Sequence, residues 1–175
     1  MKRFLVPPVL VAALALLTGI GNPAPTSDAT ERAHELHRNR VLIKQVVNGG
    51  LLLAKEEDPF DRAKRCNDIA ERLALDLELA ADDGDNLRAG ELAFHYHRLL
   101  GKGVATNLTA ARRRTPVGST GERKLDEFRK ETSGSAQRLE KRLADAANRD
   151  LRNALHDVKQ GRLEVENALD TPPNE

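Results

Sequence analysis

Histidines are the residues of this chain whose type and spacing could bind a metal ion. His34 and His37 lie three residues apart, so a helix would place both on one face. His95 and His156 follow in segments that an up-down bundle would bring to the same end. Imidazole suits borderline divalent metals such as zinc, copper or nickel. We therefore consider a metal site at these four histidines, with ordinary surface histidines as the alternative. His97 would point away from His95 on a helix and cannot share its ion.

A basic cluster is the second candidate site. Arg112, Arg113 and Arg114 are consecutive, and Arg98 and Lys102 precede them. Cations at the carboxyl end of a helix complement the helix dipole. The alternative is an anion site for phosphate, acidic polysaccharide or lipid head groups. Nucleic acid is not favoured as a partner, because no aromatic residues interleave with the basic run.

Cys66 is the single cysteine, so the chain cannot form an internal disulfide. It shares a helical stripe with Ala63, Ala70 and Leu73, which predicts a buried small residue. A disulfide between two copies of the chain is the alternative.

Motifs of known enzyme chemistry are not found in the sequence. There is no nucleophile with an adjacent base, Gly-rich phosphate loop, HExxH or CxxC. Aromatic residues make up 3% of the chain and tryptophan is absent, so a large aromatic-lined pocket is not expected. We expect no catalytic residues, no cofactor and no enzymatic activity.

The N-terminus has the order of a secretory signal peptide. Lys2 and Arg3 precede an apolar run over residues 5–17, and small residues end at Gly21. The run is too short for a comfortable membrane span of about 20 residues. We predict cleavage after Gly21 and a periplasmic or extracellular protein. A retained N-terminal anchor is the alternative and the single expected membrane contact.

Helical periodicity dominates the remaining sequence. A leader over residues 22–27 precedes a helical hairpin bundle over residues 28–111, in which Asp58-Pro59 starts one helix and residues 82–85 form a tight turn. The Asn48-Gly49-Gly50 triplet predicts a kink or a break. Residues 59–85 carry a net charge of −4 and residues 86–114 one of +5, which favours their pairing as antiparallel neighbours.

The C-terminal part is expected to be one long helix or a helix pair. A linker over residues 112–121 precedes the helical segment 122–169, and a tail follows over residues 170–175. Ser133-Gly134-Ser135 is the expected break or kink. The fold class predicted is therefore all-α, an antiparallel bundle of three to four helices with a long C-terminal helix.

Two segments resemble an uncharacterised family of exported bacterial helical proteins. The resemblance covers residues 56–63 (EEDPFDRA) and 66–70 (CNDIA), and extends to residues 103–108 (GVATNL). It implies no activity. It suggests that Asn67 and Asn107 lie within or beside a helix interface, where a hydrogen-bonded asparagine can fix the register.

The function predicted is that of an exported, non-enzymatic helical protein that acts through protein contacts, as a scaffold, adaptor or holdase-like binder. An unbroken C-terminal helix would overhang its neighbours and need a protein partner or a second copy to cover it. The alternative is an extracytoplasmic binding module for metal at His34 and His37, or for anions at residues 112–114.

Overall fold

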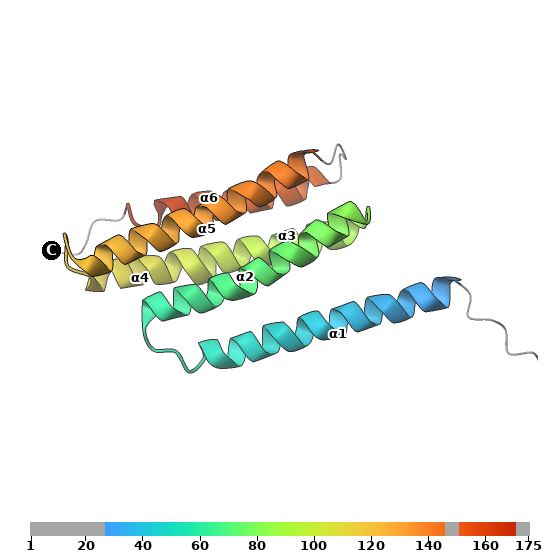
Figure 1. Cartoon of the computed structure of the whole chain (residues 1–175), viewed down its shortest axis with the longest axis horizontal. Coiled ribbons are helices and arrows are strands. Elements are labelled where there is room, and N and C mark those ends of the chain that lie inside the picture. Colours follow the sequence, from blue (N-terminus) through green and yellow to red (C-terminus); the bar gives the residue numbers. More distant parts are fainter. Residues whose placement is uncertain (1–26, 146–150, 171–175) are drawn as a thin grey trace, which may run out of the picture. The chain divides into compact units, whose positions relative to one another are not determined.

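The computed structural model describes residues 27–145 and 151–170 of the chain, and every element within these ranges is helical. The elements are α1 (Ser27–Leu53), α2 (Pro59–Asp82), α3 (Asn86–Arg98), η2 (Leu99–Ala105), α4 (Thr106–Arg114), α5 (Thr120–Asp145) and α6 (Leu151–Asn167). The predicted all-α bundle is confirmed (Figure 1). The predicted signal peptide (1–21) lies outside the described residues, as does almost all of the leader (22–27) and of the tail (170–175).

The chain divides into two units, residues 1–43 and residues 44–175, and the boundary lies within α1. The bundle of α2 to α6 belongs to the second unit. Helix α1 continues through Asn48, Gly49 and Gly50 to Leu53, so the triplet does not end it. None of the helices in the described part of the chain is long and apolar enough to cross a membrane.

Helices α2 and α3 form the predicted hairpin. The Asp58 side chain accepts hydrogen bonds from the backbone N–H groups of Phe60 and Asp61, which caps α2, and Pro59 occupies the first turn. Gly84 has a φ of +74°, a conformation that favours glycine in the turn. Asp85 then caps α3 through the backbone N–H of Arg88.

The helical segment that follows this turn, residues 86–114, is not a uniform α-helix. Between α3 and α4, the seven residues of η2 are π-helical, a feature that sequence periodicity does not predict. Two polar side chains donate hydrogen bonds to carbonyl oxygens of this wider turn. Thr106 Oγ1 donates to the oxygen of Gly101 at 3.1 Å, and Asn107 Nδ2 donates to that of Gly103 at 2.6 Å. π-Helical turns are rare and occur mostly as single turns inside α-helices, as here.

The C-terminal segment is a helix pair. Ser133, Gly134 and Ser135 lie inside α5, so the break expected there is wrong, and α5 ends at Asp145. The hydroxyl of Ser133 donates to Glu166 of α6 at 2.5 Å, and this tertiary contact outweighs the low helix propensity of the triplet. The linker between α4 and α5 is shorter than predicted and covers residues 115–119.

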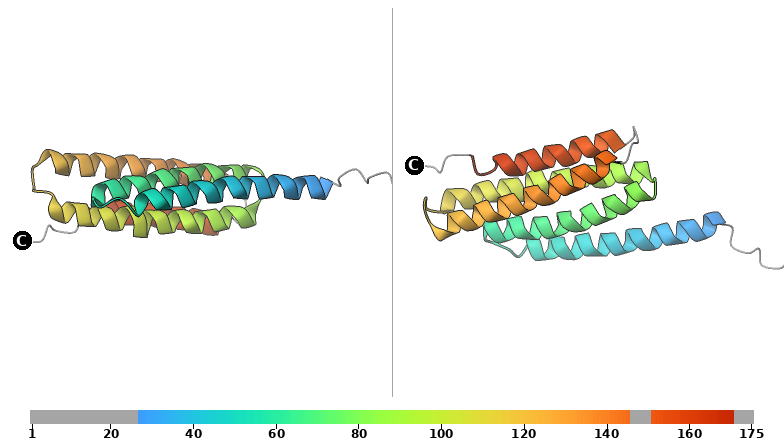
Figure 2. Two further views of the ribbon diagram at one scale, coloured as in Figure 1. Left: turned by 90° about the horizontal axis from the view of Figure 1, so that it is seen from below. Right: turned by 45° about the horizontal axis from the view of Figure 1, so that its top comes forward.

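The order of helices around the bundle creates two parallel pairs. Figures 1 and 2 show α5 running in the same direction as α2, and α6 in the same direction as α3. Contacts at both ends of the first pair agree: Phe128 meets Phe60 near the helix starts, and Arg142 meets Asp82 near the helix ends. The core between the helices consists mainly of leucine, alanine and valine, including Leu77, Leu100, Leu108, Leu139 and Val158.

Candidate functional site: an acidic cleft between α2 and α5

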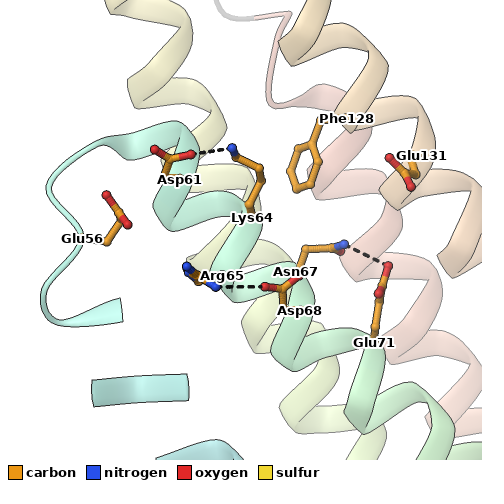
Figure 3. A pocket seen from close by; sticks show the side chains of 9 residues that line it. All are labelled: Glu56, Asp61, Lys64, Arg65, Asn67, Asp68, Glu71, Phe128 and Glu131. Carbon is orange, nitrogen blue, oxygen red and sulfur yellow. Dashed lines mark hydrogen bonds and ion pairs between the residues drawn. The ribbon is translucent and has the colours of Figure 1, made fainter. Parts of the chain in front are cut away.

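An open cleft of about 560 Å³ lies between α2, α5 and the loop that precedes α2. Five carboxylates, two cations, one amide and one aromatic ring line it (Figure 3): Glu56, Asp61, Lys64, Arg65, Asn67, Asp68, Glu71, Phe128 and Glu131. These groups give the cleft a formal charge of −3. All of them belong to the unit that contains the bundle.

Helix α2 contributes most of the polar wall. Its outward positions carry Asp61, Asp68 and Glu71, while its inward stripe is buried in the core. Asn67 sits at the boundary with 8% of its surface exposed, and its Nδ2 donates to Glu71 Oε1 at 3.1 Å. This bond satisfies a buried amide donor and holds one carboxylate against the helix.

Two of the carboxylates are paired with cations of the same helix. Lys64 Nζ lies 2.5 Å from Asp61 Oδ1, and Arg65 Nη1 lies 3.8 Å from Asp68 Oδ2. All four side chains are about half exposed. Such exposed pairs contribute about 0–1 kcal/mol each, so a cation from outside can compete for the carboxylates.

The other two acidic residues face the cleft from outside α2. Glu56 lies in the loop before α2 and Glu131 lies on α5 (Figure 3). Within the described part of the chain, neither carboxylate has a hydrogen-bond or ion-pair partner. The cleft therefore presents unpaired negative charge on both of its sides.

The aromatic ring in the cleft is Phe128 of α5. It meets Phe60 of α2 edge to face, with ring centroids 5.6 Å apart and planes at 88°. Lys64 Nζ lies 4.7 Å from the centroid of the Phe60 ring. These contacts fix the ring pair between the two helices and leave Phe128 half-buried beside the carboxylates.

The histidines predicted to bind metal are distributed over three helices. His95 is exposed on α3, with its ring 5.5 Å from that of Phe94, and His156 is exposed on α6. His37 is exposed on α1, and the side chain of His34 lies outside the described residues. Among the described residues, no group of three histidine, cysteine or acidic side chains is arranged to hold a metal ion.

The basic residues predicted to bind an anion differ in their surroundings. Arg112 is buried, and its Nη2 pairs with Glu122 Oε1 at 2.8 Å, so an acidic partner already occupies it. Arg113 and Arg114 are exposed at the end of α4, and Lys102 is exposed in η2. Arg98 lies 5.6 Å from the centroid of the Phe94 ring.

Cys66 is a free thiol with 2% of its surface exposed. Burial raises the pKa of the thiol above its usual value, although Arg62 acts in the opposite direction. A disulfide between two copies needs a sulfur at the surface, so this position favours the buried small residue over the intermolecular bond.

The cleft was not predicted, although four of its residues, Glu56, Asp61, Asn67 and Asp68, lie in the segments that carry the resemblance. Asn67 is buried, with its hydrogen bond to Glu71 of the same helix, and Asp61 belongs to the first turn of α2. The missing information is the pairing of α2 with α5, which places Phe128 and Glu131 opposite these residues. An excess of acidic residues on α2 was the signal in the sequence.

Comparisons with protein-family models, curated protein sequences and solved structures find no match for this chain.

Proposed function

We propose that the chain is an exported, non-enzymatic helical protein that binds a basic segment of a protein partner in the cleft between α2 and α5. The observation that carries the proposal is the pair of unpaired carboxylates, Glu56 and Glu131, on either side of a cleft that also contains an aromatic ring. Lysine and arginine side chains complement both features, since their charged ends pair with carboxylates and their stems pack on apolar surface.

The spread of the acidic groups favours a peptide over a single small cation. Asp61 and Glu71 are ten residues apart on α2, which corresponds to about 15 Å along the helix axis. A segment with several basic side chains can reach carboxylates over this length. When no ligand is bound, Lys64 and Arg65 neutralise part of the negative charge of the cleft. Because their ion pairs are exposed and weak, a basic ligand can replace them at little cost in free energy.

The test is binding of a fluorescently labelled hexalysine peptide, measured by anisotropy at low ionic strength. We expect saturable binding with one peptide per chain, weakened by salt. The double variant Glu56→Gln/Glu131→Gln should bind about tenfold more weakly, because it removes two attractions worth about 0.5–1 kcal/mol each.

The matched control is Glu57→Gln/Glu127→Gln, which changes the net charge equally at exposed positions that do not line the cleft. Its affinity should stay within about twofold of the wild type. Equal losses in the two double variants would show attraction to the overall charge, and absence of saturable binding would overturn the proposal.

Export has its own test. Expressed in a bacterial host, the protein should be recovered outside the cytoplasm, with an N-terminus that begins at Asn22. Recovery from the cytoplasm with Met1 intact would contradict it.

A further inference from the structure

Helix α1 exposes an unusual amount of apolar surface. Seven of the large hydrophobic side chains exposed in the described part of the chain belong to this helix: Leu36, Val41, Ile43, Val46, Val47, Leu51 and Leu52. Monomeric soluble proteins rarely leave a contiguous apolar patch of several hundred Å² open to water. This surface therefore needs an occupant.

The most exposed of these side chains follow one another along one stripe of the helix. Leu36 is 71% exposed, Ile43 62%, Val47 53% and Leu51 60%, at successive spacings of seven, four and four residues. This spacing keeps all four side chains on one side of an α-helix. From Val41 to Ala54 the chain has a single charged residue, Lys44, so little opposes contact along this length.

We propose that the occupant is α1 of a second copy of the chain, which makes the protein a reversible homodimer. A stripe that is apolar along its length is complementary to itself and suits a two-fold interface, in which the same patch serves both copies. The charged residues around the start of the stripe are also compatible with pairing of two copies. Residues 28–40 contain three acidic and three basic residues, so two copies approach without net repulsion.

The size of the surface matches a weak dimer. A helix of 27 residues is about 40 Å long and about 10 Å wide, which gives a footprint of roughly 400 Å² on each copy. Stable interfaces bury about 800 Å² per partner. We therefore expect dissociation at low protein concentration. The inference does not depend on the cleft, which involves other residues.

Sedimentation velocity over a wide concentration range tests this on the protein as recovered from the expressing cell. The wild type should move from the monomer mass toward twice that mass as concentration rises. The variant Ile43→Glu/Val47→Glu should stay monomeric over the same range, with an unchanged helical circular dichroism signal.

The control is Leu87→Glu, which introduces one glutamate at a side chain that is 79% exposed on α3. It should dimerise like the wild type. A wild type that is monomeric at every concentration would mean that α1 finds its cover within its own chain and would overturn the proposal. So would a dimer that Leu87→Glu dissociates and Ile43→Glu/Val47→Glu does not.

Discussion

His97 Nε2 of α3 lies 3.0 Å from Glu164 Oε1 of α6, while its Nδ1 lies 3.7 Å from Asp157 Oδ1. The histidine thus bridges two carboxylates that are seven residues apart on one helix. The helices approach closely here because Gly161 stands opposite His97 and Leu100. A Cβ on Gly161 would lie 3.3 Å from His97 Cα, so a glycine at this point permits the polar bridge to form.

The first prediction concerns the coupling between His97 and Glu164. A double-mutant cycle with His97→Gln and Glu164→Gln should give a coupling of about 0.5–1 kcal/mol in the free energy of unfolding, as for partly exposed pairs. Urea denaturation of the four proteins at one pH measures it. Strictly additive effects would mean that the contact contributes nothing to stability.

The second prediction concerns two glycines, Gly90 of α3 and Gly103 of η2. A Cβ on Gly103 would lie 2.9 Å from both Cβ and Sγ of Cys66, whereas a Cβ on Gly90 would meet nothing within 4 Å. Gly103→Ala should therefore lower the free energy of unfolding by about 1–2 kcal/mol through overpacking. Gly90→Ala should raise it by about 0.5–1 kcal/mol, because alanine favours the helix. Thermal melts of both variants give the sign of each change in stability. A stabilised Gly103→Ala protein would contradict the close contact with Cys66.

The boundaries of α2 and α3 could be predicted because their signals are local. Asp58 and Pro59 cap and start one helix, and Asp85 caps the next. The interior of α5 could not be predicted in the same way. Ser133 and Gly134 disfavour a helix by themselves, and the carboxylate of Glu166, 33 residues later, supplies the bond that retains them.

The π-helical turns and the cleft depend on long-range packing. Gly101 and Gly103 lie in η2 where side chains of α6 and α2 come close, but their spacing alone does not reveal these neighbours. The cleft needs Phe128 of α5 beside α2, and helical periodicity does not give the order of helices around a bundle. Which residues become buried was therefore more predictable than which surfaces meet.

The third prediction concerns acid. The hydroxyl of Ser133 donates to Glu166, and Arg162 pairs with it, so the pKa of this carboxyl is lowered below its usual 4.5. A lowered pKa in the folded state adds stability above the unfolded pKa, and this stability is lost as pH falls through the folded value. Glu166→Gln should therefore lose less stability than the wild type between pH 7 and pH 3.

Urea denaturation at a series of pH values measures this acid dependence. The control is Glu127→Gln, at an exposed position on α5, which should keep the steeper decline of the wild type. Identical pH profiles for the wild type and Glu166→Gln would contradict the lowered pKa.

The fourth prediction concerns alkali and uses the single tyrosine of a chain without tryptophan. Burial, followed by the nearby carboxylates of Glu71 and Glu140, raises the pKa of Tyr96, which is 3% exposed. Because the folded pKa lies above the unfolded value near 10, stability is complete below pH 10 and declines as pH rises. Phenolate absorbance should therefore appear together with loss of the helical circular dichroism signal, whereas urea-unfolded protein should titrate near pH 10. Tyr96→Phe should unfold at higher pH than the wild type, and a phenolate that forms near pH 10 in the folded protein would contradict this placement of the ring.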